Sequence, residues 1–226
     1  MMPRLLLIET STTLCSVALA EGDRIVASRE DPSRQHASLT APFVEAVLKE
    51  RGLKVADCDA VCVSKGPGSY TGLRVGVSTA KGLCFGAGIP LLAVGSLDVL
   101  AWQAIDGGLL PAGCKAIVPM IDARRMEVYS AVYSPAGERQ TEVAPTIVEP
   151  GTFDALEGPV LFIGDGVEKC RPLLPEGSSA VVCCPHAKAL LHPAGAAFAA
   201  GRFEDLAYFE PFYLKDFIAT VPKKLF

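Results

Sequence analysis

Short apolar runs separated by polar turns dominate the start of the chain and predict strands rather than helices. The three predicted strands cover Leu5–Ile8, Cys15–Ala20 and Arg24–Arg29. Apolar side chains then recur at helical spacing from His36 to Arg51, and Gly52 is a typical helix terminator. We therefore expect a three-stranded meander followed by one amphipathic helix.

Strand and helix patterns then alternate, as they do in βαβ arrangements. The Val-rich segment Asp59–Ser64 predicts a strand, and a helix is expected from Thr71 to Ala87 after a glycine-rich loop. A short strand over Leu91–Val94 follows, and Ser96 is a candidate cap for a helix over Leu97–Ile105. These elements complete the first half of the chain.

The second half repeats this order of elements, although less regularly. Its predicted elements are strands over Lys115–Ile121, over Glu127–Tyr133, within Arg139–Ile147 and over Val160–Ile163, and a helix inside His186–Gly201. Shifting the first half by 113 residues places Ile8-Glu9 on Ile121-Asp122. A duplicated unit fits this pattern better than one doubly wound sheet. We therefore predict an α/β protein with an N-terminal lobe over residues 1–106 and a C-terminal lobe over residues 107–226.

This layout resembles the actin-like, or Hsp70-type, ATPase fold, a duplicated ββαβα fold with two subdomains. In that superfamily the first turn of each half holds nucleotide phosphates and magnesium. The resemblance places these turns at Glu9-Thr10-Ser11 and Asp122-Ala123-Arg124, and neither has the glycine that allows a close approach to phosphate. The candidate nucleotide-proximal residues are Glu9, Thr10, Ser11, Asp122, Arg124, Gly164 and Asp165. Nucleotide chemistry by this chain alone is therefore not expected.

The segment from Ser64 to Arg74, SKGPGSYTGLR, is the most distinctive in the chain. It follows a predicted strand and opens a helix, a position where backbone amides can bind anions. It is not a P-loop, because no Gly-Lys followed by Ser or Thr occurs, and its third glycine comes one residue late for a Rossmann fingerprint. The spacing favours a tight turn capped by Ser69 or Thr71.

Small residues recur at four-residue spacing in the helix that follows, at Gly72, Gly76 and Ala80. A glycine in a helix interior costs about 1 kcal/mol relative to alanine, so a close packing partner must compensate for it. That partner is either another part of this chain or a second subunit that contacts two helices of this one. The candidate interface residues are His36, Leu39, Phe43, Val47, Gly72, Gly76, Thr79, Ala80 and Leu83.

Composition narrows the functional classes. Half of the 226 residues are hydrophobic, which excludes a disordered chain, and the net charge of −4 disfavours a protein that grips nucleic acid unaided. The longest uncharged stretch, residues 82–97, is too short to span a membrane, and the apolar run after Arg4 is too short for a signal peptide. We expect a cytoplasmic protein whose eight cysteines are reduced.

The histidines and cysteines predict no metal site. None of the three histidines is followed by another at the i+4 position that a metal-binding helix requires. No two cysteines are separated by two residues, so neither a zinc ribbon nor a redox pair is indicated. Cysteines inside apolar runs are expected to act as small hydrophobic residues.

Several segments, in their order along the chain, resemble the TsaB (YeaZ) family, which is also described as glycoprotease-like. They are Leu7–Ser11, Cys15–Leu19, Gly66–Gly76, Ile121–Arg124, Glu127–Tyr129, Gly164–Gly166 and Pro211–Lys215. The resemblance implies a non-catalytic subunit that binds a TsaD-like catalytic paralogue through its N-terminal helices and forms homodimers through the same surface. It also implies a TsaE-like ATPase in the complex, which transfers a threonylcarbamoyl group to N6 of adenosine 37 in tRNA. ATP, magnesium and metal are then expected on the partner subunits, and tRNA is reached only through the complex.

Two other functions stay open at the level of the sequence. An autonomous ATPase or kinase of the actin-like fold would need Glu9 and Asp122 to hold magnesium and the Gly164-Asp165-Gly166 turn to approach a nucleotide. A glycoprotease-like peptidase would need a zinc motif, or a Ser or Cys nucleophile with a partner, and no such motif is evident. Binding of magnesium-ATP by the isolated chain separates the ATPase from the non-catalytic subunit.

Overall fold

The first sheet holds five strands in the order β3-β2-β1-β4-β5. The computed structural model describes residues 3–215. The strands are β1 (Arg4–Glu9), β2 (Cys15–Glu21), β3 (Arg24–Asp31), β4 (Ala60–Ser64) and β5 (Leu91–Val94). The first three strands form the predicted antiparallel meander, and β4 and β5 extend the sheet in parallel. Every residue of β4 is buried, which explains its continuous run of apolar side chains.

The second sheet repeats this arrangement in the order β8-β7-β6-β9-β10. Its strands are β6 (Ala116–Asp122), β7 (Glu127–Ser130), β8 (Ala144–Ile147), β9 (Val160–Ile163) and β10 (Ser179–Val181). Parallel and antiparallel pairs match those of the first sheet strand for strand, with β6 in the place of β1. The duplicated α/β fold with two subdomains is therefore confirmed.

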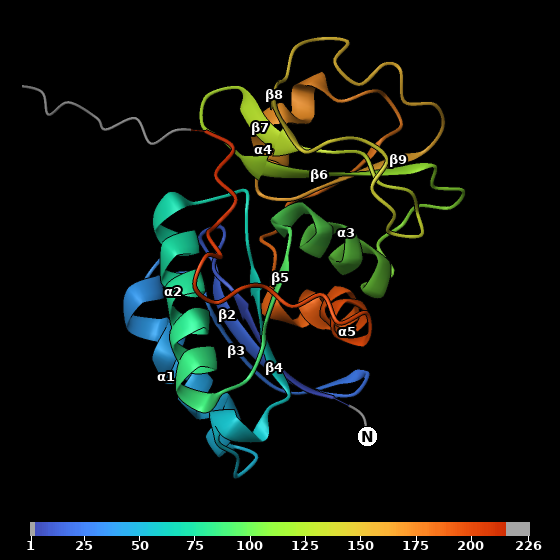
Figure 1. Ribbon diagram of the computed structural model, residues 1–226. Coiled ribbons are helices and arrows are strands. Elements are labelled where there is room, and N and C mark those ends of the chain that lie inside the picture. The colour runs from blue at the N-terminus through green and yellow to red at the C-terminus, as the bar shows by residue number, and fades with distance from the viewer. Residues whose placement is uncertain (1–2, 216–226) are drawn as a thin grey trace, which may run out of the picture.

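Two long helices, α1 (His36–Lys49) and α2 (Tyr70–Ala87), cover one face of the first sheet (Figure 1). A 3₁₀ turn, η1 (Val55–Asp57), lies between them in the chain. Ser69 caps α2 as predicted, because its hydroxyl accepts a hydrogen bond from the Gly72 amide at 3.3 Å. Gly88 ends α2 with a φ of 68°, a left-handed conformation that glycine adopts without strain.

Helices α3 and α5 are exchanged between the two halves of the chain. Helix α3 (Ser96–Asp106) belongs to the first half but packs on the second sheet, where Leu97 and Leu100 meet Ile117 and Leu161. Conversely, η3 (Ala187–Leu190) and α5 (Leu191–Ala199) come from the second half and cover the free face of the first sheet. The two lobes therefore share their cores. The boundary between residues 106 and 107 stays a prediction, and residues 216–226 of the second lobe lie outside the described part.

Some predicted details need correction. Ser96 does not cap α3: Gly95 holds the cap position, and the Ser96 hydroxyl has no partner among the described residues. Strand β7 ends at Ser130 rather than at Tyr133, which makes only isolated bridges beyond the strand. Between β9 and β10 the second half has only α4 (Val167–Cys170) and η2 (Arg171–Leu173) where the first half has α2. Within residues 3–215, no helix is long and apolar enough to cross a membrane.

Candidate functional site

The turn after β1 is completely buried. Glu9 ends the strand, and Glu9, Thr10 and Ser11 have no exposed surface. One Glu9 carboxylate oxygen, Oε1, accepts a hydrogen bond from the Ser11 amide at 2.5 Å, while Oε2 has no partner within the described part of the chain. Burial raises the pKa of Glu9, and the hydrogen bonds from Ser11 offset this only in part. The carboxyl group is therefore not presented to a ligand.

The glycine-rich loop before α2 packs directly on the turn formed by Glu9, Thr10 and Ser11. The Ser69 amide donates to the Ser11 carbonyl at 2.6 Å, and the Thr10 hydroxyl donates to the Gly72 carbonyl at 2.8 Å. A Cβ atom at Gly68 would lie 2.2 Å from the Ser11 carbonyl oxygen, and one at Gly72 would lie 2.1 Å from that of Thr10. These glycines are therefore required by contact between two loops of the same chain.

The same contact corrects the interface predicted on the small residues of α2. Gly72, Gly76 and Ala80 are all buried, and a Cβ atom at Gly76 would lie 2.2 Å from Thr10 Oγ1. Internal packing, one of the two interpretations of their spacing, accounts for their small size. They present no side chain to a second subunit.

The turn after β6 differs from the turn after β1, because Asp122 and Arg124 are exposed and only the Gly164-Asp165-Gly166 turn packs against the end of β6. Gly164 has a φ of 134°, and a Cβ atom there would lie 2.1 Å from the Met120 carbonyl oxygen. The Gly166 amide donates to that same carbonyl at 3.0 Å. One Asp165 carboxylate oxygen, Oδ1, accepts a hydrogen bond from the Asp122 amide at 3.0 Å, and burial raises the pKa of Asp165. The Gly164-Asp165-Gly166 turn thus folds back onto β6.

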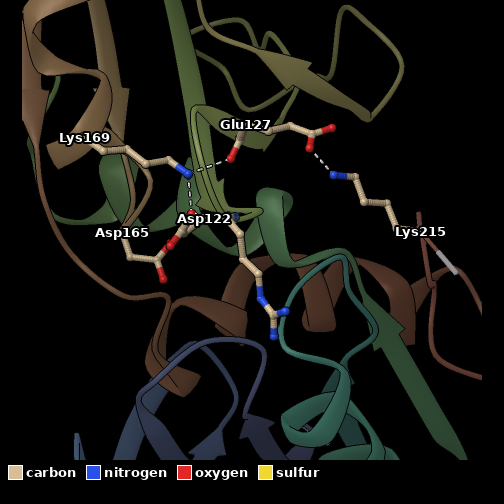
Figure 2. Close-up of polar contacts among 6 residues, drawn as sticks. Asp122, Glu127, Asp165, Lys169 and Lys215 are labelled. Atoms are coloured by element: carbon tan, nitrogen blue, oxygen red, sulfur yellow. Dashed lines mark hydrogen bonds and ion pairs between the residues drawn. The ribbon is translucent and has the colours of Figure 1, made fainter. Parts of the chain in front are cut away.

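Two lysines from distant segments of the chain approach the acidic residues Asp122 and Glu127, which flank the turn between β6 and β7, as Figure 2 shows. Lys169 of α4 donates to Asp122 Oδ1 and, at 2.7 Å, to the Glu127 carbonyl. Lys215 pairs with the Glu127 carboxylate. Arg124 is exposed and has a φ of 70°, and its amide donates to Asp122 Oδ1 at 2.8 Å. Asp122 is therefore already paired with a cation of the chain itself.

The two turns do not fit the magnesium and nucleotide of the actin-like ATPases. The Glu9 carboxyl is enclosed, and the glycines that could approach a phosphate contact the neighbouring turn instead. At Asp122, an ammonium group stands where a metal cation would pair. Among the described residues, no group of three or more His, Cys, Asp or Glu side chains is placed to hold a metal ion.

The other candidate interface residues lie on α1 and α2 with different exposure. His36 and Val47 are buried, and His36 Nε2 lies 2.9 Å from the Thr12 carbonyl oxygen. Burial lowers the pKa of His36, and the His36 ring is the donor in this hydrogen bond because a carbonyl oxygen can only accept. The half-buried residues that reach the surface are Leu39, Phe43, Thr79 and Leu83.

Sequence reasoning missed one exposed apolar residue of α2, on another side of the helix from Thr79 and Leu83. Phe85 of α2 is 83% exposed. It lies between Gly82 and Gly86 in the chain, and a Cβ atom added at either glycine would have no neighbour within 4 Å. A large apolar residue flanked by two helix glycines, outside the row of buried positions, is the signal that could have identified it.

Two matched sheets, each with a turn after its first strand at the junction of the lobes, define a two-lobed protein of the actin-like fold. The activator of 2-hydroxyisocaproyl-CoA dehydratase from Clostridium difficile shares this fold at 11% identity, with a TM-score of 0.50 over 88% of this chain and 96% of that one. A family model described as "TsaD: tRNA N6-adenosine threonylcarbamoyltransferase" matches residues 28–217.

Closer relatives define the family. The tRNA threonylcarbamoyladenosine biosynthesis protein TsaB of Escherichia coli (strain K12) is 31% identical in an alignment of 227 positions that covers 96% of each chain. The structure of YeaZ from Pseudomonas aeruginosa is 31% identical and superposes with a TM-score of 0.81 over 94% of this chain and 100% of that one. The chain belongs to the TsaB (YeaZ) family.

Proposed function

We propose that this chain is a non-catalytic subunit required for N6-threonylcarbamoyladenosine modification of adenosine 37 in tRNA. Membership of a family whose Escherichia coli relative is named for the biosynthesis of this nucleoside supports the reaction. The observation that carries the non-catalytic role is the state of two carboxylates: Glu9 is buried, and Asp122, although exposed, is paired with Lys169. Catalysis then belongs to a TsaD-like paralogue, with ATP, magnesium and metal on the partner subunits, including a TsaE-like ATPase.

The proposed partner surface is the outer side of α1 and α2. Its residues are the half-buried Leu39, Phe43, Thr79 and Leu83, together with the exposed Phe85. Because residues two apart on a helix do not share a face, Phe85 extends this surface around the exposed side of α2. We propose that the same surface forms a homodimer when the partner is absent. With a net charge of −4, the chain reaches tRNA only through the complex, in the cytoplasm.

Co-purification with the TsaD-like partner, followed by a threonylcarbamoylation assay, tests this proposal. We expect modification of tRNA only when this chain is present. Phe85→Asp should abolish the complex and the activity without unfolding the chain, because the side chain is 83% exposed. Ile147→Asp is the matched control, because Ile147 is 63% exposed on β8 of the other sheet. Full activity without this chain would refute the proposal, and an intact complex with Phe85→Asp would place the interface elsewhere.

Titration of the isolated chain with magnesium-ATP tests the non-catalytic role separately. We expect no binding of magnesium-ATP, because the side chains of neither turn are arranged to hold it. Tight binding with hydrolysis that is lost in Asp122→Asn would instead support an autonomous ATPase.

A further inference from the structure

The last described segment, residues 204–215, crosses the molecule as an extended strap (Figure 1). We call it the C-terminal strap. It leaves α5, passes α2 and ends beside the second sheet. Its route brings a segment from the end of the chain against the glycine-rich loop of the first lobe. None of its contacts is required by the function proposed above.

The strap begins at the edge of the first sheet and is held beside α2. The Glu204 amide donates to the Leu91 carbonyl at 2.9 Å and so covers the free edge of β5. Further along, Lys81 of α2 donates to the Phe209 carbonyl at 2.8 Å. A cavity of about 230 Å³ remains between the strap and α2, lined by Arg74, Ser78, Lys81, Phe209 and Tyr213 among others.

The middle of the strap contacts the glycine-rich loop directly. The Phe212 amide donates to the Lys65 carbonyl at 2.7 Å. Gly66 has a φ of 113°, and a Cβ atom there would lie 2.6 Å from the Phe212 carbonyl oxygen. The rings of Tyr213 and Tyr70 lie 4.7 Å apart. The glycine at position 66 is therefore explained by the docking of the strap.

The end of the strap reaches the second lobe. Lys215 pairs with the Glu127 carboxylate and lies 5.9 Å from the centre of the Tyr129 ring. Glu127 is also the residue whose carbonyl accepts from Lys169, which in turn pairs with Asp122 (Figure 2). One continuous set of contacts thus links the glycine-rich loop of the first lobe to the acidic turn of the second.

We propose that the C-terminal strap is a reversible clasp between the lobes, with Lys215 and Glu127 as its outer latch. The latch side chains are 38% and 23% exposed, and an ion pair at such a position is weak and sensitive to salt. The backbone contacts at Lys65 and Leu91 hold the strap on the first lobe. Opening the latch loosens the strap and, through Phe212, the glycine-rich loop.

Hydrogen–deuterium exchange of the full chain, resolved by peptide, tests the clasp. Lys215→Met and Glu127→Gln should each speed exchange of residues 204–215 and of residues 65–74 about two- to fivefold, the range for a partly exposed ion pair. The double variant should show no further increase, because both substitutions remove the same pair. Lys188→Met is the matched control, since it removes the Lys188–Glu30 ion pair away from the strap.

A reciprocal variant distinguishes a clasp from a local ion pair. Lys81→Met removes the hydrogen bond to Phe209 on the first lobe, and a clasp then predicts faster exchange at residues 122–127 of the second lobe as well. Unchanged exchange of the strap in Lys215→Met, or an equal effect of Lys188→Met, would overturn the proposal. So would a Lys81→Met effect confined to the first lobe.

Discussion

Thr10 determines which glycines of α2 can accept a side chain. We predict that Gly72→Ala destabilises the chain by about 1–3 kcal/mol, the usual cost of overpacking a core, because the new Cβ atom would lie 2.1 Å from the Thr10 carbonyl oxygen. Gly82→Ala, in the same helix but with open space around it, should stabilise the chain by about 0.5–1 kcal/mol. Urea denaturation of both variants measures the difference. Effects of the same sign would contradict the packing described here.

The buried carboxyl of Glu9 predicts a specific pH dependence. Burial raises its pKa above the ordinary value of 4.5, so ionisation is less favourable in the folded chain than in the unfolded one. The stabilising contribution of the protonated form is fully present below pH 4.5 and is lost as the pH rises through the folded-state pKa. Glu9→Gln should therefore gain stability relative to the wild type as the pH increases above 4.5. The lowered pKa of His36 also makes the stability depend on pH. Because His36 is present in both proteins, its contribution cancels from the difference in stability between them.

At the residue scale, the sequence was informative about motifs but not about what they contact. The spacing of Gly72, Gly76 and Ala80 indicated a close packing partner. The structure identifies Thr10 as the partner of the two glycines, whereas Ala80 lies in the hydrophobic core. Spacing alone does not distinguish an internal neighbour from a second subunit, because both require the same small residues. Lys169 and Lys215 were not predicted to meet at the acidic turn, since nothing local links positions so far apart in the chain.

At the scale of elements, the helix starts provide a matched pair of serines. Ser69→Ala should destabilise the chain by about 1 kcal/mol, because the hydroxyl caps the Gly72 amide at the start of α2. Ser96→Ala should leave the stability unchanged or raise it by up to about 1 kcal/mol, because the buried hydroxyl at the start of α3 has no partner among the described residues. Thermal unfolding of the two variants tests both expectations. An equal loss of stability in the two variants would show that Ser69 does not cap α2.

The elements of the first half were predictable because their patterns are strong. Buried strands such as β4 are continuous apolar runs, and α1 and α2 have clear stop signals at Gly52 and Gly88. The second half was less predictable, since β7 and β8 are four residues each and the counterpart of α2 is reduced to α4 and η2. Such short elements contain too few residues for a hydrophobic periodicity to be recognised in the sequence.

At the scale of the whole molecule, the exchange of α3 and α5 makes the lobes interdependent. Ala187, Leu190 and Ala194 cover the face of the first sheet formed by Leu5 and Leu7, among others. We therefore predict that a fragment of residues 1–106 does not fold cooperatively alone, because that face would be exposed to water. Calorimetry and circular dichroism of the fragment provide the measurement. A sharp two-state transition in the isolated fragment would contradict this and support a lobe boundary after residue 106.

The arrangement of the lobes was the part of the fold that the sequence did not predict. Duplication followed from the repeated order of elements, and the matching strand orders confirm it. Which helix covers which sheet depends on contacts between residues far apart in the chain, as between Leu5 and Ala187 of η3, and no local pattern encodes such contacts. At this scale the net charge of −4 disfavours direct binding of tRNA and is compatible with a role in a complex, and both stay predictions.

We propose that this chain supports tRNA modification without performing chemistry at its own two turns. The most direct test is the initial rate of threonylcarbamoylation by the reconstituted complex, with this chain either wild type or carrying both Glu9→Gln and Asp122→Asn. We expect equal rates at saturating subunit concentration, because the proposal assigns neither carboxyl a role in holding a metal or a nucleotide. A folded double variant that still binds its partner but lowers the rate tenfold or more, about 1.4 kcal/mol of lost transition-state stabilisation, would contradict it.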